Sequence, residues 1–335
     1  MQIMIINKIM KNRFQVLDGW RGISILLVLL AHWFPIGPKA WQMNVTVAAT
    51  GMVFFFILSG FLITNILLKD QHIGHFLTRR LLRIVPLAWL VMLITFSLTS
   101  SSTDIYLPHF LFYANWPPMW LTNPTGHFWS LCVEMQFYML IAILVYTFKQ
   151  RALSLLPFLC IAITFYRYLN DAPANINTYY RIDEILAGCI LALVYSHRND
   201  GLKRWIGKLN PIYLFPLLLL SAHPEGGLIA YFRPYIALLV IGSTLFATQT
   251  LWYHSWLKGR ILFYIASISY AVYVIHIGLA HTWLGDGETL EKYLKRPLLL
   301  AVTFGLAHLS TFYYEKYWID LGKKLTFKKT AMLKT

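Results

Sequence analysis

The residues best suited to chemistry in this sequence are ionisable side chains that lie within or beside long apolar stretches. His32 follows one such stretch, and Glu134 and His276 lie in two others, in a chain that has only 14 acidic residues. A charge at the centre of a bilayer costs about 2.5–3.5 kcal/mol on insertion scales. Such residues are therefore functional candidates, with structural pairing as the alternative.

Asp18, Arg21 and His32 are predicted to form one polar stripe along a helix. At 100° per residue, Arg21 lies within about 20° and Asp18 within about 40° of the helical face of His32. The distance from Arg21 to His32 along the helix would be about 16 Å. Asp18 and Arg21 can pair because they are three residues apart. The alternative is a structural ion pair beside an unrelated histidine.

His32, Glu134 and His276 are predicted to lie at a similar depth in three different helices. Glu134 lies about two turns inside the outer boundary of its stretch, and Tyr138 is one turn deeper on the same face. Three ionisable groups at one depth indicate a polar cavity that opens outward. A hydrogen-bonded structural role is the alternative for Glu134 and for His276.

A basic cluster formed by Arg79, Arg80 and Arg83 precedes the third apolar stretch. Arg79 and Arg83 share a helical face, and Arg80 lies beside Arg83. Guanidinium groups bind phosphate oxygens through bidentate hydrogen bonds, although anchoring of a cytoplasmic loop would explain the cluster equally well. In the second stretch, Gly51 and Gly60 predict close packing of helices.

Membrane helices must position these residues, because the composition excludes a soluble fold. Of the 335 residues, 58% are hydrophobic and 13% are charged, and the mean hydropathy is +0.56. A soluble protein carries about 25% charged residues, so lipid must be the solvent for most of this chain. Since a helix needs about 17–25 apolar residues to cross a bilayer, we predict an all-α polytopic membrane protein with about ten transmembrane helices. The predicted spans are 18–36, 45–68, 84–100, 128–148, 152–168, 182–196, 211–223, 233–251, 261–282 and 297–318.

The basic residues are unevenly distributed among the connecting segments. Of the 29 Lys and Arg residues, the predicted cytoplasmic segments hold nearly three times as many as the outer segments. By the positive-inside rule, both termini are predicted to be cytoplasmic. The rule also accounts for the net charge of +15, so nucleic acid is not an expected partner. The predicted organisation is a cytoplasmic N-terminal segment (1–17), a ten-helix membrane domain (18–318) and a basic cytoplasmic tail (319–335).

Six short motifs occur in order along most of the chain. Together they resemble the bacterial acyltransferase-three family of integral membrane O-acyltransferases, whose fold has a ten-helix core. The motifs are Leu-Asp-Gly-x-Arg-Gly followed by His32, Phe-Phe-x-x-Ser-Gly-Phe (Phe55–Phe61), Arg-Arg-x-x-Arg-x-x-Pro (Arg79–Pro86), Trp-Ser-Leu-x-x-Glu-x-x-Phe-Tyr (Trp129–Tyr138), Arg-x-Asp-x-x-x-x-Gly (Arg181–Gly188) and Ser-Tyr-x-x-Tyr-x-x-His (Ser269–His276).

The resemblance implies transfer of an acyl group, usually acetyl, from cytoplasmic acyl-CoA to a hydroxyl group outside. The acceptor would be a cell-surface glycan or a lipid-linked saccharide, and the protein would lie in the inner (cytoplasmic) membrane. Acyl-CoA is then a co-substrate, and we expect no permanently bound cofactor and no metal. Arg79, Arg80 and Arg83 would bind the CoA phosphates, and Arg21 and Asp18 would shape the donor end of the polar stripe.

The predicted chemistry assigns the central role to a histidine. Removal of a hydroxyl proton near neutral pH suits a side chain whose unperturbed pKa is about 6.5. His32 is the predicted general base, and Glu134 would orient His32 or the acceptor. Direct attack by the hydroxyl is the simpler scheme, and an acyl-histidine intermediate stays open. The residues predicted to bind substrate or support the site are Trp129, Ser130, Tyr138, Ser269, Tyr270, Tyr273 and His276.

The sequence departs from the family pattern at two positions. Val53 stands where members often carry an acidic residue, and the proline usual two residues after the glutamate of the last span is missing after Glu315. We expect Glu315 and His308, both in the last span, to be structural. Some relatives add an extracytoplasmic hydrolase-like domain, which this chain is expected to lack.

Two other functional classes fit some of these features. A transporter or flippase of polar envelope glycans is the main alternative, because intramembrane charges also mark transport paths. A non-catalytic membrane scaffold or sensor is the third class. The lack of internal repeats and the cytoplasmic arginine cluster favour the enzyme. The identity of the acceptor, the position acylated, the length of the acyl group and the oligomeric state stay open.

Overall fold

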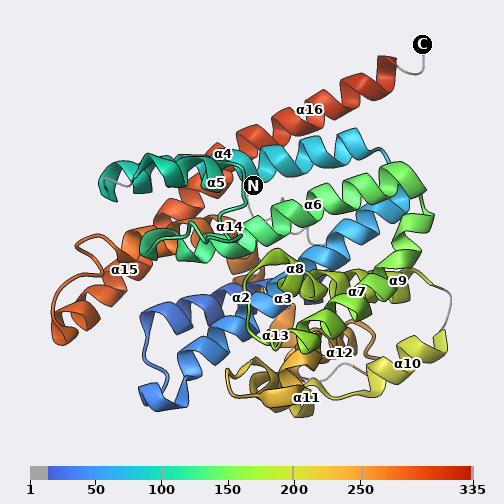
Figure 1. The fold of residues 1–335 in the computed structure, drawn as a ribbon, viewed down its shortest axis with the longest axis horizontal. Coiled ribbons are helices and arrows are strands. Elements are labelled where there is room, and N and C mark those ends of the chain that lie inside the picture. Colours follow the sequence, from blue (N-terminus) through green and yellow to red (C-terminus); the bar gives the residue numbers. More distant parts are fainter. Residues whose placement is uncertain (1–13, 100–101, 198–199, 250–251, 333–335) are drawn as a thin grey trace. The chain divides into compact units, whose positions relative to one another are not determined.

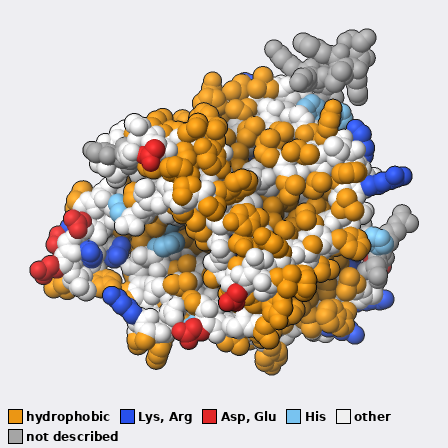
Figure 2. All heavy atoms as spheres, viewed as in Figure 1, with side chains coloured by type: hydrophobic (Ala, Val, Ile, Leu, Met, Phe, Trp, Pro, Cys, Tyr) orange, Lys and Arg blue, Asp and Glu red, His pale blue; other side chains and the backbone are white. Residues whose placement is uncertain are grey.

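The computed structural model describes residues 14–99, 102–197, 200–249 and 252–332. It confirms the all-α prediction, because 82% of the chain is helical and these ranges contain no strand (Figure 1). Hydrophobic side chains dominate the face drawn in Figure 2, and charged side chains lie mainly at its margins. Such a surface suits a protein whose main solvent is lipid.

Short connections join helices of very different length. The helices are α2 (Gln15–Trp33), η1 (Lys39–Trp41), α3 (Met43–Lys69), α4 (Ile73–Thr99), η2 (Thr103–Ile105), α5 (Tyr106–Phe110), η3 (Asn123–Phe128), α6 (Trp129–Phe148), α7 (Arg151–Leu169), α8 (Thr178–Arg181), α9 (Asp183–Ser196), α10 (Asp200–Lys208), α11 (Pro211–Ala222), η4 (Gly227–Phe232), α12 (Arg233–Leu245), α13 (Trp252–Leu257), α14 (Arg260–Ala280), α15 (Thr289–Leu309), the π-helical η5 (Ser310–Glu315) and α16 (Lys316–Met332).

Eight helices of the described chain are long and apolar enough to cross a bilayer, or nine if the bent pair α10–α11 forms one span. The sixth predicted span, 182–196, corresponds to α9, which has 14 residues and falls short of the usual length. The total of ten spans and the cytoplasmic position of both termini therefore stay predictions.

The bend of 82° between α10 and α11 has a local cause. The side chain of Asn210 caps α11 by accepting a hydrogen bond from the Ile212 amide at 2.9 Å. Pro211 occupies the first helical position, where its missing N–H costs nothing. A new helix therefore begins where α10 ends.

The described chain divides into two compact units. The first contains the chain up to Asn65 together with Pro157–Ala174 and Asp183–Ser269. The second contains Ile66–Leu156, Asn175–Ile182 and the chain from Tyr270 onward. Each unit has its own polar residues, and each is described by itself below.

Glycines allow the close helix packing within the first unit. A Cβ atom on Gly60 of α3 would lie 1.9 Å from the Ile185 carbonyl oxygen of α9, and one on Gly188 would lie 2.1 Å from the Ile57 carbonyl oxygen. The two helices thus cross with backbone against backbone, which no larger residue permits. Gly51 likewise packs against α2, where the Ser24 hydroxyl donates to the Gly51 carbonyl at 2.7 Å. These contacts confirm the packing predicted for Gly51 and Gly60.

Two buried ion pairs also hold the first unit together. Arg167 of α7 pairs with Asp183 at 2.5 Å, and Arg233 of α12 pairs with Glu184 at 2.7 Å. All four side chains are at most 2% exposed. Both guanidinium groups also donate a hydrogen bond to the Pro173 carbonyl. Removal of one partner from such a pair leaves an uncompensated buried charge.

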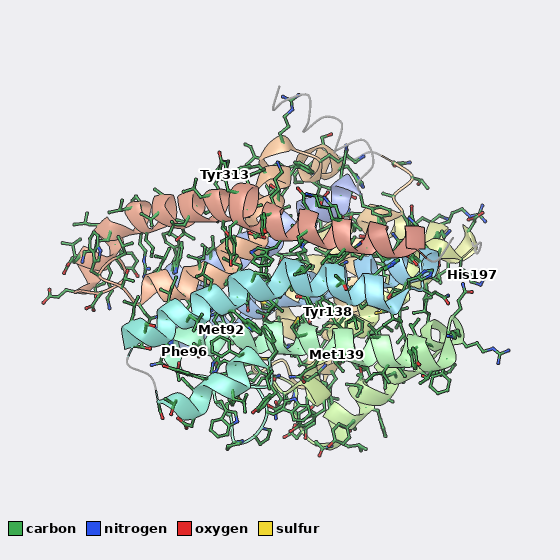
Figure 3. All side chains as sticks on the ribbon, turned by 90° about the horizontal axis from the view of Figure 1, so that it is seen from above. Met92, Phe96, Tyr138, Met139, His197 and Tyr313 are labelled. Atoms are coloured by element: carbon green, nitrogen blue, oxygen red, sulfur yellow. The ribbon has the colours of Figure 1, made fainter. Side chains whose placement is uncertain are left out.

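The second unit is built from α4, α6, the second half of α14 and the continuous rod of α15, η5 and α16. Figure 3 shows α16 running alongside α4. The end of α4 is held by α5, because Phe96 stacks on Tyr106 with ring centroids 4.8 Å apart. Trp89 donates to the Phe110 carbonyl at 3.0 Å. This unit contains the basic cluster, Glu134 and His276.

Candidate active site

Arg80, Tyr138 and Glu134 form a polar chain between α4 and α6. The Tyr138 hydroxyl donates to Glu134 Oε1 at 2.5 Å. The guanidinium of Arg80 lies 5.9 Å from the centroid of the same tyrosine ring and also hydrogen-bonds to the Tyr138 side chain. Glu134 is 5% exposed and Tyr138 is 1% exposed. A cation and a carboxylate are thus linked inside the protein, where such interactions are strong because water is excluded.

A second polar set joins α4, α14 and η5. Glu315 is buried and accepts hydrogen bonds from Ser310 at 3.2 Å and from Thr311 at 2.9 Å. Arg83 interacts electrostatically with Glu315 and with Tyr270, whose hydroxyl donates to the backbone of α4. Glu315 ends a π-helical turn, a rare conformation that occurs frequently at functional sites.

The two polar sets are in electrostatic contact with each other. Tyr270 of the second set interacts with both Glu134 and Tyr138 of the first. Arg80 interacts with Arg83 and with Glu134. We call the six residues Arg80, Arg83, Glu134, Tyr138, Tyr270 and Glu315 the polar core of the second unit.

The polar core differs from the arrangement predicted from the sequence. We expected the arginines at a cytoplasmic donor end and Glu134 at a separate outer end. Arg80 is seven residues from the start of α4, about 10 Å along the helix axis, and Tyr138 lies at the middle of α6. The long side chain of Arg80 therefore reaches Tyr138 within the helix bundle. An estimate of depth from the sequence uses only the position of a residue along its helix. It therefore places Arg80 at the membrane surface, because it ignores the direction of the side chain.

Arg79 differs from its two neighbours in the cluster. Its side chain is exposed, and its Nε donates to Thr326 of α16 at 2.9 Å. This hydrogen bond ties α16 to α4. Arg79 is thus the outlying member of the cluster, and Arg80 and Arg83 are the members that reach the polar core.

Asp18, Arg21 and His32 lie on the single helix α2 of the first unit, as predicted. Asp18 and Arg21 are half-buried, and His32 is exposed at the last turn. The His32 ring hydrogen-bonds to the Val28 carbonyl. A neutral imidazole that donates one N–H to a carbonyl carries its lone pair on the other nitrogen, which is the form a general base needs. His32 and Glu134 belong to different units, and their meeting in one cavity stays a prediction.

His276 lies in a buried cluster between α6 and α14. Its ring is fully buried, its Nδ1 lies 2.6 Å from the Tyr273 carbonyl, and the centroid of the His127 ring lies 5.1 Å away. The Tyr273 hydroxyl contacts the Ser130 hydroxyl at 2.5 Å and donates to the His127 carbonyl. These contacts fasten the start of α6 to α14. Contacts of this kind hold helices in place, so we interpret His276 as a residue that supports the site.

The two remaining predicted residues also have defined partners. The guanidinium of buried Arg181 lies 5.2 Å from the Trp129 ring centroid, so Trp129 covers a cation. Ser269 is buried, and its hydroxyl donates to the Ala266 carbonyl of its own helix at 2.8 Å. The Ser269 hydroxyl therefore forms this hydrogen bond within its own helix.

Sequence reasoning missed two residues that the structure places in these clusters. Glu315 was expected to be structural rather than functional, and the structure places it in the polar core, where its role stays a prediction. Its signal in the sequence is Ser310 and Thr311, hydroxyl residues one turn earlier that can hydrogen-bond to it. His127 precedes α6, and its Nε2 lies 3.2 Å from the Val274 carbonyl. Because Val274 is 147 residues away in the sequence, no local pattern predicts this contact.

One group in the described part of the chain has the donors to hold a metal ion. Ligand atoms of Asp70, His72 and His75 lie within 4.8 Å of one another at the α3–α4 turn. The backbone N–H and the side chain of His72 hydrogen-bond to Asp70, which lowers the pKa of the Asp70 carboxyl. These contacts serve to start α4. The expectation of no resident metal stays a prediction.

Comparisons with known proteins identify the family of this chain. The family described as "Acyltransferase domain" matches residues 14–315. A provisionally named O-acetyltransferase of Staphylococcus aureus (strain COL) is 26% identical over 324 residues, which cover 81% of this chain and 52% of that protein. A provisionally named peptidoglycan O-acetyltransferase of Bacillus subtilis (strain 168) is 28% identical over 58% of this chain and 35% of its own length.

A third relative, nodulation protein 10 of Rhizobium leguminosarum bv. viciae, is 23% identical over 42% of this chain and 46% of its own length. The chain spans about half the length of the first of these relatives. No solved structure matches.

Proposed function

Since the chain belongs to the acyltransferase domain family, we propose that it transfers an acyl group from cytoplasmic acyl-CoA to a hydroxyl of a cell-surface or lipid-linked glycan. The names of the relatives indicate acetyl as the group transferred and, in the Bacillus relative, peptidoglycan as the acceptor. The proposed location is the inner (cytoplasmic) membrane, with acyl-CoA as co-substrate and without a resident cofactor.

The polar core is the observation that best supports this proposal. Arg80, Tyr138 and Glu134 form a connected chain of donors and acceptors within a helical membrane protein. Ionisable groups are retained at such positions mainly for function, because their insertion into the membrane is unfavourable. Arg79, Arg80 and Arg83 would bind the phosphates of CoA.

The proposed reaction is a direct acyl transfer. The acceptor oxygen forms a new ester bond with the acyl carbon while the carbon–sulfur bond of the thioester breaks. His32 accepts the hydroxyl proton and passes it to the leaving CoA thiolate, which becomes free CoA thiol. Glu134, oriented by Tyr138, would position the acceptor or His32.

A transfer assay tests this proposal directly. The purified protein in lipid nanodiscs would be given acetyl-CoA labelled in the acetyl group, together with an envelope glycan fraction. We expect release of CoA thiol that depends on the acceptor, and an alkali-labile label on the glycan. Movement of unmodified glycan across the bilayer without consumption of acetyl-CoA would contradict acyl transfer and identify a flippase.

A further inference from the structure

An apolar groove runs along the second unit beside the polar core. Its volume is about 700 Å³, and its walls come from α4, α14 and the junction of α15 with η5. Leu90, Ile94 and Leu98 line it from α4, Gly278 from α14, and Leu306 from α15. Nothing in the reaction described above uses this space.

The groove follows one stripe of α4. Its α4 residues begin at Leu87, continue as adjacent pairs spaced four residues apart and end at Thr99. Twelve residues of helix correspond to about 18 Å, slightly more than half the roughly 30 Å thickness of a bilayer core. The groove is thus long enough for a chain comparable to those of membrane lipids.

One end of the groove adjoins the polar core on all three walls. On each wall, a residue of the polar core lies within five sequence positions of the groove residue nearest to that end. Arg83 precedes Leu87 on α4 by four residues, and Tyr270 precedes Ile275 on α14 by five. Glu315 directly follows Tyr314, whose hydroxyl donates to the Pro86 carbonyl at 3.3 Å. One end of the apolar groove therefore lies close to the charged residues of the polar core.

Helical periodicity places the arginines in line with the groove. Arg80, Arg83, Leu87, Leu90 and Ile94 are separated by three or four residues in turn, so they share one face of α4. A ligand that fits this stripe has an anionic head, a polar middle and a long apolar tail. A long-chain acyl thioester of CoA has this sequence of parts, with phosphates, then the thioester, then the hydrocarbon chain.

We propose that the groove receives the acyl chain of the donor, so that the protein accepts acyl groups much longer than acetyl. This inference rests on the proposed function and defines the donor class. An acetyl group would leave the groove unused, whereas a longer chain would bury its methylenes against Leu90, Ile94 and Leu306. Gly278 leaves the groove wide, since a Cβ atom there would meet only the Thr95 hydroxyl, at 3.6 Å.

A chain-length series tests the inference. Acyl transfer would be measured in nanodiscs with acetyl-, butyryl-, octanoyl- and decanoyl-CoA. For the parent protein, the donor Michaelis constant should fall by about twofold to fourfold per methylene, the upper value corresponding to full burial. The Ile94→Trp variant, whose indole would obstruct the groove midway along α4, should lose most of this gain and retain acetyl transfer.

A neighbouring residue provides a matched control. Leu93 and Ile94 are both 51% exposed, but only Ile94 lines the groove. Leu93→Trp should keep the full dependence on chain length. A gain that is equal in the parent and in both variants would show simple partitioning of the donor into the bilayer and would overturn the inference.

The remaining outcomes separate the inference from the proposed function. Transfer of acetyl with no gain for longer chains would reject the groove as a donor site and leave acyl transfer intact. Failure to transfer any of the four acyl groups to any acceptor would reject the proposed function itself. A Gly278→Leu variant provides an independent test from α14, and it should shorten the longest chain accepted in the same way.

Discussion

The hydrogen bond from Tyr138 to Glu134 provides the sharpest test of the polar core. Tyr138→Phe removes one hydroxyl and preserves the ring that packs against Arg80. The carboxylate of Glu134 is buried, so it loses a charge-assisted hydrogen bond that water replaces poorly. Hydrogen bonds to charged groups contribute about 1.5–3 kcal/mol.

This free energy translates into a defined change in rate. At about 1.4 kcal/mol per factor of ten, misplacement of Glu134 should lower turnover by about tenfold to 150-fold. The assay is the initial rate of acetyl transfer at saturating acetyl-CoA, together with the thermal unfolding midpoint in the same detergent. The Michaelis constant for the donor should change less than the turnover, because the variant removes one hydrogen bond to Arg80 but keeps all three arginine side chains.

A matched variant on the same helix separates function from general damage. Tyr146 is 72% exposed on α6, so Tyr146→Phe should leave the turnover unchanged. If Tyr138→Phe folds normally and its turnover stays within about threefold of the parent, Glu134 does not depend on Tyr138 and the reasoning about the polar core is wrong.

Three further predictions concern donor binding and the packing of the first unit. Arg83→Gln should raise the Michaelis constant for acetyl-CoA by about tenfold or more in initial-rate measurements, with turnover retained, because a charged contact to phosphate is lost. Arg233→Ala should destabilise the protein by about 3–5 kcal/mol in denaturant titrations, since buried Glu184 would lose the cation that hydrogen-bonds to it. Gly60→Ala should lower stability by about 1–3 kcal/mol because its new methyl group overlaps a carbonyl of α9, whereas Gly74→Ala, which meets nothing within 4 Å, should not.

Local patterns in the sequence were sufficient to predict the long helices and the glycine contacts. The apolar run before His32 forms one helix, and the 3.6-residue repeat correctly places Asp18, Arg21 and His32 on it. Gly60 of α3 was expected at a helix contact, and it lies against α9. These features depend on neighbouring residues, so hydropathy and periodicity reveal them.

Features that depend on tertiary contacts were not predictable in the same way. The link from Arg80 to Tyr138 requires two helices that are far apart in sequence to pack with a particular rotation. Glu315 of the polar core ends a π-helix, a local change of pitch that no propensity identifies.

The assignment of His32 as general base is the central mechanistic claim, and one variant tests it most directly. General base catalysis typically contributes 10²–10⁴-fold, so His32→Ala should lower the rate of acyl transfer at saturating donor by at least about a hundredfold. His197→Ala, which changes an exposed histidine at the end of α9, should retain the parental rate. Acetyl-CoA affinity should be largely kept in both variants. A folded His32→Ala protein whose rate lies within about threefold of the parent would contradict the account and make Glu134 the leading candidate for the base.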